Sequence, residues 1–440
     1  MLISFSVENF KSFRERATIS LLAHRADKTL PGSLISPPAG VTPQGTPLLP
    51  VVAIYGPNAG GKTNIIKAFE YLRDAVLFSQ TMWIPRSGTR VSPHAQCPDA
   101  PSRFEVEFSK NSVRYKYAIT VDNAVFREET LHAFPHGRER ILFSRTTALD
   151  GDDYSTSVEF GPHFQADRRD RDSFSRRARP NSLLLSACAQ ENQPDAADIY
   201  RWFQTELKIH NFADPSPGDL YMTSAMLDSY EDFRALAVGL MQAADASVLD
   251  IYVNRIDGSE LPFKSGAQID LETFDDEMRK YRVEFEMEGA DSTFLVPLEN
   301  QSSGIKRLYA VCADLLSALR FGYTILVDEL EASLHPQMAA QIMALFKSKL
   351  TNRYGAQLVY STHETRFLNL NHLRRDEIWF VEKISGASVA YSLLEFSPRK
   401  DQDLEKSYLR GRFGAIPTAN FLPEWVSALY KEDSTDLPKS

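Results

Sequence analysis

The sequence has 440 residues, of which 43% are hydrophobic and 24% are charged, and this composition excludes a wholly disordered chain. The net charge of −9 excludes a uniformly basic surface for nucleic acid, although a local basic patch remains compatible with it. The three cysteines (Cys97, Cys188 and Cys312) are widely spaced, so neither a disulfide framework nor a CxxC zinc site is expected. The sequence contains no apolar run of membrane length and no signal-peptide pattern, which predicts a soluble, cytoplasmic protein without a membrane partner.

The first 160 residues show the patterns of a strand-rich region around one helix. Residues 2–10 alternate between apolar and polar side chains, as in a strand at a sheet surface. Residues 51–55 form a continuous apolar run, which predicts a buried parallel strand. Apolar side chains then recur at helical spacing over residues 62–79. Short alternating strands are expected over residues 103–145.

The rest of the chain is expected to alternate between helical and strand-rich stretches. A polar loop rich in Asp and Arg is predicted over residues 149–180. The further expected elements are helices over 183–244, strands over 249–298, buried strands over 323–327 and 357–360, a helix over 337–350 and a final strand over 378–381. The tail after Tyr430 is polar and is expected to be frayed.

Residues 56–63 read Gly-Pro-Asn-Ala-Gly-Gly-Lys-Thr and match the phosphate-binding pattern G-x-x-x-x-G-K-[ST]. The motif lies between a predicted strand and a predicted helix, where its backbone N–H groups can surround phosphates at a helix N-terminus. Lys62 is expected to reach the β- and γ-phosphates of ATP, and the Thr63 hydroxyl to ligate Mg²⁺. The nucleotide-binding residues expected here are Gly56, Asn58, Gly60, Gly61, Lys62, Thr63 and Asn64.

A pair of acids follows a second buried strand, in Ile-Leu-Val-Asp-Glu at residues 325–329. Asp328 is placed to hold Mg²⁺, directly or through water, and Glu329 to act as the general base for the attacking water. Two solvated acids at a strand end are a common alternative, but the phosphate-binding motif favours the functional interpretation.

Three further segments accompany these motifs. Residues 299–308 contain a Ser-Ser-Gly turn that leads into a helix, residues 331–336 follow the acidic pair, and His363 ends another buried strand. With these motifs in this order, the sequence resembles the ABC-type ATPases, in the AAA-family branch that includes SMC, RecF and OLD proteins. The general layout and residues 408–417 resemble the stand-alone ATPases of bacterial abortive-infection and phage-defence operons, including the PARIS and Septu types.

The resemblance implies roles for the additional motifs. Ser303 and Gly304 would be the signature residues, which contact the γ-phosphate of ATP bound to a second copy of the chain. Residues 331–336 would form the D-loop, and His363 would be the switch that senses the γ-phosphate in cis. The Ser-Ser-Gly-Ile-Lys sequence departs from the Leu-Ser-Gly-Gly-Gln of transporters, which argues against a transporter subunit, and Lys306 could add charge towards phosphate or DNA.

Some candidate residues keep two interpretations. Gln190 is either the Q-loop glutamine near the metal or a surface glutamine, and Lys11 and Arg14 are only candidates for the neighbourhood of the nucleotide. The arginine cluster at residues 168–179 could bind a phosphate backbone such as DNA, or it could be a solvated loop in which aspartates offset the charge.

The expected fold is α/β, a P-loop NTPase of the ABC-ATPase type with a mixed-sheet core, a strand-rich lobe and an inserted helical lobe. No sustained heptad or CxxC occurs, so no long coiled coil is expected. The expected divisions are an N-terminal ATPase lobe (1–160), an inserted, largely helical subdomain (161–298), a C-terminal ATPase lobe (299–400) and a C-terminal segment with the tail (401–440).

The first functional hypothesis is an ATPase that uses ATP and Mg²⁺, dimerises on ATP, and serves as sensor or regulatory subunit of an antiphage system. Its partners would be a second copy of itself, in a dimer or a higher oligomer, and a nuclease or toxin from a neighbouring gene. One alternative is a scaffold that sequesters an effector with little turnover. Another is a RecF-like DNA-repair ATPase.

Overall fold

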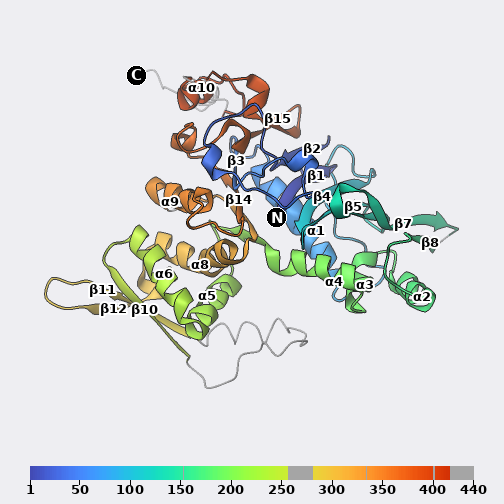
Figure 1. Ribbon diagram of the computed structural model, residues 1–440, viewed down its shortest axis with the longest axis horizontal. Helices are drawn as coiled ribbons and strands as arrows, with labels where there is room; N and C mark the ends of the chain where they lie inside the picture. Colours follow the sequence, from blue (N-terminus) through green and yellow to red (C-terminus); the bar gives the residue numbers. More distant parts are fainter. Residues whose placement is uncertain (152, 256–280, 333, 400–401, 417–440) are drawn as a thin grey trace, which may run out of the picture.

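The computed structural model describes residues 1–151, 153–255, 281–332, 334–399 and 402–416, and Figure 1 shows their arrangement. A seven-stranded antiparallel sheet is built from the N-terminal part of the chain, in the order β2-β1-β4-β5-β6-β7-β8. Its strands are β1 (Leu2–Glu8), β2 (Ala17–Ser20), β4 (Ser102–Lys110), β5 (Val113–Val121), β6 (Phe126–Phe134), β7 (Arg140–Asp150) and β8 (Asp153–Phe160).

A second sheet has six strands in the order β16-β15-β3-β14-β13-β9, and only β16 runs antiparallel to its neighbour. The strands are β3 (Val51–Tyr55), β9 (Leu207–Asn211), β13 (Thr324–Asp328), β14 (Gln357–Thr362), β15 (Ile378–Ile384) and β16 (Ala387–Ser392). All residues of β3, β13 and β14 are buried, as expected for parallel strands covered on both faces.

Each face of this parallel sheet supports its own hydrophobic core. Val52 and Ile54 of β3 belong to the core shared with the first sheet and with α1 (Lys62–Phe78). Val51, Ala53 and Tyr55 belong to the other core, which contains α8 (Ser303–Phe321) and α9 (Pro336–Lys347). The alternation of side chains along a strand therefore sends neighbouring residues of β3 into different cores.

A third group of elements packs against α8 and lies apart from the first sheet in Figure 1. It comprises α5 (Pro217–Ser229), α6 (Glu231–Ala244) and a three-stranded sheet of β10 (Val248–Arg255), β11 (Tyr281–Met287) and β12 (Phe294–Pro297). The remaining helices are α2 (Arg168–Arg177), α3 (Leu184–Gln190), α4 (Pro194–Arg201), a π-helical turn (Trp202–Glu206) and α10 (Leu404–Leu409).

A buried histidine joins the parallel sheet to these helices. His210 of β9 lies between Asp219 of α5, with Nδ1 3.3 Å from Oδ1, and Asp314 of α8, with Nε2 2.9 Å from Oδ2. Burial alone would lower the pKa of His210, but the two carboxylates raise it to about 9. His210 is therefore a cation at neutral pH, and its charge ties β9 to two helices.

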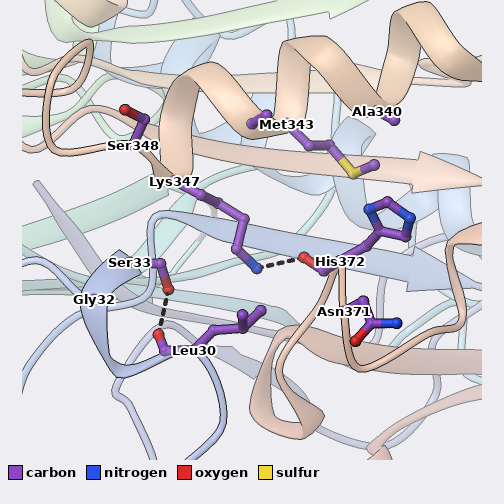
Figure 2. A pocket seen from close by; sticks show the side chains of 10 residues that line it. Leu30, Gly32, Ser33, Ala340, Met343, Lys347, Ser348, Asn371 and His372 are labelled. Carbon is purple, nitrogen blue, oxygen red and sulfur yellow. Dashed lines mark hydrogen bonds between the residues drawn. The ribbon is translucent and has the colours of Figure 1, made fainter.

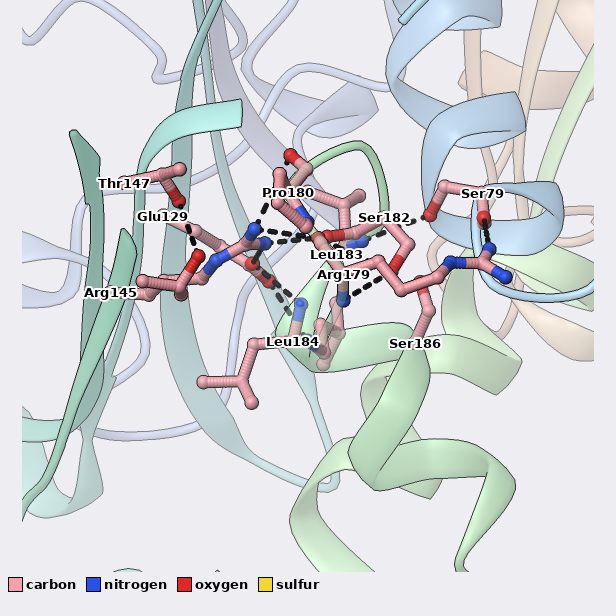
Figure 3. Close-up of polar contacts among 12 residues, drawn as sticks. Ser79, Glu129, Arg145, Thr147, Arg179, Pro180, Ser182, Leu183, Leu184 and Ser186 are labelled. Atoms are coloured by element: carbon pink, nitrogen blue, oxygen red, sulfur yellow. Dashed lines mark hydrogen bonds and ion pairs between the residues drawn. The ribbon is translucent and has the colours of Figure 1, made fainter. Parts of the chain in front are cut away.

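A second buried polar cluster anchors α3 to the first sheet (Figure 3). The carboxylate of Glu129 on β6 accepts hydrogen bonds from the backbone N–H groups of Leu184 (2.6 Å) and Leu185 (2.8 Å) at the start of α3. Arg145 on β7 pairs with Glu129 and donates to the carbonyl oxygen of Ser182. The carboxylate satisfies N–H groups that a helix N-terminus otherwise leaves unpaired.

The structure corrects several sequence expectations. The predicted loop over 149–180 is wrong, because β8 and α2 both lie within it. The small polar residues of β8 hide the hydrophobic alternation of a strand, and α2 is held by an N-cap from Asp167 and by buried Phe174. The predicted helical stretch 183–244 also contains β9, and β16 follows the strand expected to be final.

The longest helix in the described residues is α8, with 19 residues, and no described helix has both the length and the hydrophobicity needed to cross a bilayer. The described residues therefore contain no long coiled coil.

Candidate functional site

The phosphate-binding motif forms a tight loop between β3 and α1. Gly61 precedes α1 with φ of 119°, a backbone conformation that L-residues rarely adopt. A Cβ atom on Gly56 would lie 2.0 Å from the carbonyl oxygen of Val381 on β15, and one on Gly61 would lie 2.3 Å from Oγ of Ser388 on β16. The loop therefore packs against the β15–β16 hairpin so closely that only glycine fits at these positions.

Lys62 is buried and its ammonium group bridges three parts of the site. Nζ donates to the carbonyl oxygens of Gly56 (2.8 Å) and Pro57 (3.1 Å) and lies 3.0 Å from Nε2 of His363. Burial lowers the pKa of Lys62 to about 8, while the carboxylates of Asp328, Glu331 and Glu329 oppose that shift. The lysine is thus a partly desolvated cation facing acids, where it can meet phosphate oxygens.

The acidic pair ends β13 beside the last residues of β14. The hydroxyl of Ser361 donates to Oδ1 of Asp328 (2.5 Å) and accepts from the backbone N–H of Glu329 (2.8 Å). Glu329 has φ of 56°, a left-handed conformation that is uncommon for a residue with a side chain and is often found at functional sites. Ser361 therefore holds both acids in one arrangement.

His363 follows β14 and has two fixed points. Its ring faces Lys62, and its backbone N–H donates to Oε1 of Glu331. Burial lowers the pKa of His363, and the charge of Lys62 lowers it further, so the ring is neutral at pH 7. Burial also raises the pKa of Glu331. A neutral histidine and a carboxylate thus connect the strand end to the segment after the acidic pair.

The other residues expected in the motif lie along the same loop and the first turn of α1. Asn58 is exposed at the loop tip, and Thr63 is half-buried in the first turn of α1. The side-chain amide of Asn64 donates to Oγ of Ser12 (2.7 Å), and the carbonyl oxygen of Gly60 accepts from Oγ of Ser388 (2.6 Å). These bonds fix the loop, and they leave Asn58 and Thr63 at its accessible side.

The predicted signature residues begin α8. Ser302 caps this helix by accepting from the N–H of Ile305 (3.3 Å), and Ser303 is exposed while Gly304 is half-buried. None of the described hydrogen bonds connects Ser303 or Gly304 to the phosphate-binding loop of the same chain. An exposed N-terminus with unpaired N–H groups can bind an anion supplied from outside the protomer.

Comparison with known proteins decides the family. Residues 51–369 match a family model described as "AAA domain, putative AbiEii toxin, Type IV TA system". The chain belongs to this AAA family. The order of its parallel strands, with a P-loop after β3 and the acidic pair after β13, agrees with the ABC-type P-loop fold, so both the fold and the family prediction are confirmed.

Solved structures similar to this AAA-domain protein include the SMC head domain from Thermotoga maritima. The two share 14% identity with a TM-score of 0.38, and the match covers 89% of this chain and 98% of that chain. The SMC head bound to the C-terminal winged-helix domain of ScpA is 12% identical with a TM-score of 0.41, and covers 89% and 97%. A search of curated proteins gave no match.

The residues of the AAA domain suit ATP with Mg²⁺. The loop packs closely against the β15–β16 hairpin, and the buried ammonium group of Lys62 is bonded to carbonyl oxygens of the loop that phosphate oxygens could replace. Thr63 and Asp328 offer the hard oxygen ligands that Mg²⁺ prefers, and Oδ2 of Asp328 accepts no hydrogen bond from the described residues. The donor set therefore fits the expected cofactors.

Gln190 is not brought to this site. It ends α3 and its side chain contacts the hydroxyl of Tyr200, which donates to the carbonyl oxygen of Leu77 (2.9 Å). Leu77 is in the last turn of α1, whereas Lys62 is in the first, about 20 Å away at the rise of an α-helix. The helix that carries Gln190 packs against the C-terminal end of α1, whereas the P-loop lies at the N-terminal end, so Gln190 is too far away to contact a nucleotide there.

The other candidates have a mixed outcome. Lys11 lies over the ring of Phe10 and Arg14 pairs with Glu15, and neither has a described contact with the P-loop. Ser12, between them, does contact it. Lys306 is half-buried in the first turn of α8. Some of the predicted segments lie partly outside the described residues. They are the expected D-loop at Ser333, residues 400–401, and residues 417–440 of the expected C-terminal segment.

Sequence reasoning missed several residues of the site. Asn211 ends β9 directly beside Asp328 in the parallel register, so its side chain is at the same edge as the acids. Ser361, Ser12 and Ser388 hold the motif residues in place. A detectable signal existed for Ser361 alone, because it directly follows the apolar run of β14.

A cavity of about 360 Å³ lies away from this site, between α9 and the loops at residues 30–33 and 371–372. Figure 2 shows Lys347 crossing it, with Nζ donating to the carbonyl oxygen of His372 (2.6 Å). None of the residues expected to bind nucleotide lines this cavity.

Proposed function

We propose that this protein binds ATP with Mg²⁺, hydrolyses it between two copies of the chain, and regulates a separate nuclease or toxin in cytoplasmic antiphage defence. One observation carries the proposal: Lys62, the pair Asp328 and Glu329, and His363 come from three separate segments and meet at one edge of the parallel sheet. This edge, formed by the carboxyl ends of parallel strands, is where α/β proteins bind ligands.

Separate side chains of the protein would carry out the separate steps of hydrolysis. Lys62 would exchange its carbonyl partners for phosphate oxygens and neutralise their charge. The carboxylate of Glu329, held by the strained backbone at φ of 56°, would accept the proton of the attacking water. Thr63 and Asp328 would hold Mg²⁺, which would supply positive charge to stabilise the phosphate oxygens.

The position of the N-terminus of α8 supports a dimer. Its N-terminal residues Ser303 and Gly304 have no described bond to the P-loop of their own chain, and they would complete the site of a second copy. ATP would then hold two copies together, and its hydrolysis would release them. The family description, with its AbiEii toxin and type IV toxin–antitoxin wording, supports a role in defence.

The test is the Glu329→Gln variant, which removes the base and keeps the shape of the side chain. We expect the turnover of ATP to fall at least about 100-fold while ATP binding persists, because general bases contribute factors of this size. Light scattering should show that the variant accumulates as an ATP-bound dimer. Glu288→Gln, which changes an exposed acid far from the site, is the matched control.

Protection against phage distinguishes cycling from scaffolding. Loss of protection in cells that carry Glu329→Gln supports the proposal. Normal protection by this variant, with turnover abolished, would favour the scaffold function, in which ATP binding alone assembles the complex.

A further inference from the structure

The antiparallel sheet ends in an open edge at β8. Among the described residues, this strand pairs only with β7, over an uninterrupted register from Phe143–Phe160 to Asp150–Asp153. Its 8 residues include no Lys, no Pro and no bulge, which are three of the devices that block edge strands in natural proteins, and its exposed charged residues are Asp153 and Glu159. The opposite edge strand, β2, has only 4 residues. The long edge at β8 is therefore available for pairing with another strand.

Small side chains leave the backbone of β8 accessible. Ser155 and Ser157 are exposed, and Thr156 between them is half-buried. In Figure 1, β7 and β8 project from the sheet at the right of the view, and α2 lies near them. A groove of about 600 Å³ runs between β8 and α2, lined by Val158, Phe160, Ala166, Arg168, Arg171, Asp172 and Ser175.

The helix beside this edge is basic in a protein that is acidic overall. Its sequence, Arg-Arg-Asp-Arg-Asp-Ser-Phe-Ser-Arg-Arg, holds 5 arginines against 2 aspartates, whereas the whole chain carries −9. Arg171 is fixed by the carbonyl oxygens of Phe164 (2.9 Å) and Ala166 (3.1 Å). The exposed arginines without an ion-pair partner in the described residues are Arg168, Arg169 and Arg176.

We propose that β8 and α2 together bind an extended acidic segment of another protein by strand addition. The main chain of the segment would pair with the β8 edge, and carboxylates at alternate positions would reach the α2 arginines. The identification of the partner as the effector rests on the proposed function. The binding itself depends only on this surface, which is on a different sheet from the P-loop.

Two other occupants fit the surface less well. A second copy of the chain, paired β8 to β8, would bring two basic α2 helices close together, and like charges oppose that contact. A nucleic acid could meet the arginines, but it has no peptide N–H and C=O groups to pair with the strand edge. An acidic peptide uses both features of the surface.

The test uses a fluorescein-labelled peptide of alternating Val and Glu, matched to the 8 residues of β8, and the full-length protein. We expect the peptide to bind in anisotropy titrations and to slow amide hydrogen exchange over residues 153–160. A peptide of alternating Val and Lys should not bind. The double variant Arg168→Glu/Arg169→Glu should weaken binding at least about tenfold, since each charge pair contributes up to ~1 kcal/mol. Lys349→Glu, another exposed charge reversal, should leave it unchanged.

Two proline variants test the main-chain pairing. Successive residues of an edge strand direct their N–H groups alternately inward and outward, so one of Ser155→Pro and Thr156→Pro leaves the β7–β8 pairing intact. That folded variant should lose peptide binding and keep its ATP turnover. ATP turnover therefore reports on the nucleotide site, independently of peptide binding. If the wild-type protein does not hydrolyse ATP, only the proposed function is contradicted.

Three results would overturn the inference. The first is no binding of the Val–Glu peptide by the wild-type protein. The second is peptide binding that the folded proline variant retains. The third is tighter binding of a duplex oligonucleotide that depends on the arginines and not on the strand edge, which would assign the surface to nucleic acid.

Discussion

Nζ of Lys62 lies 3.0 Å from Nε2 of His363, although 301 residues separate the two in the sequence. Because His363 is neutral at pH 7, its ring nitrogen can accept a hydrogen bond from the lysine. The residue expected to hold phosphate and the residue expected to sense it are thus in direct contact. A nucleotide phosphate that draws Lys62 towards it would change the position of His363 at the same time.

The depressed pKa of Lys62 predicts a pH dependence of ATP binding. The lysine loses its charge as the pH rises through about 8, whereas phosphate oxygens favour the charged form. The dissociation constant of ATP should therefore rise about tenfold per pH unit above 8. Calorimetric titrations between pH 7 and 9 measure this. Lys62→Arg, which stays charged, should give a flat profile, and an equal slope in both proteins would contradict the assignment.

Ser361 should matter more for turnover than for affinity. Ser361→Ala removes the acceptor for the N–H of Glu329 and the donor to Asp328, and the unpaired groups should cost about 1–3 kcal/mol in the free energy of unfolding. The turnover number should fall at least about tenfold, with a smaller change in ATP affinity. Ser317→Ala, a buried serine in α8, is the matched control. Equal losses in both variants would show a purely structural effect.

One glycine substitution should abolish ATP binding, and another should stabilise the protein. Gly56→Ala places a Cβ atom 2.0 Å from the carbonyl oxygen of Val381, so the loop must move and ATP binding should be lost. Gly239→Ala, on the exposed side of α6, meets nothing within 4 Å and should raise the free energy of unfolding by about 1 kcal/mol. Urea unfolding and ATP titration of both variants check this pair.

His210 predicts that stability falls in alkaline solution. Its pKa is raised from 6.5 to about 9 in the folded protein, so its contribution is complete below pH 6.5 and is lost as the pH rises through 9. The loss should be on the order of 3 kcal/mol. His210→Gln should remove this part of the slope in urea unfolding curves from pH 6 to 10. An unchanged slope would show that the histidine is not charged between Asp219 and Asp314.

The sequence predicted the elements with strong local signals. The strands β3, β13 and β14 are continuous apolar runs, and the loop after β3 has a motif with fixed spacing. Lys62, Asp328, Glu329 and His363 lie together at the sheet edge because parallel strands end at the same side. In these cases the local pattern and the tertiary arrangement agree.

The wrong predictions have one physical cause. Where the local sequence pattern is weak, contacts with residues far away in the sequence decide which structure forms. β9 is a short strand of mixed polarity, Leu-Lys-Ile-His-Asn, and it is a strand because it pairs with β13. β8 pairs with β7 in the same way. For Gln190, the sequence gives its place on a helix but not the end of α1 against which that helix packs.

The nucleotide-binding sheet draws its parallel strands from residues 51–55, 207–211, 324–328, 357–362 and 378–384. During synthesis, the P-loop leaves the ribosome long before the acids and the histidine that complete the site. Pairing across such sequence distances is slow and cannot begin until most of the chain exists. Prematurely terminated chains should therefore be unable to bind ATP, and a cell that makes this protein gains a nucleotide-dependent response only from finished copies.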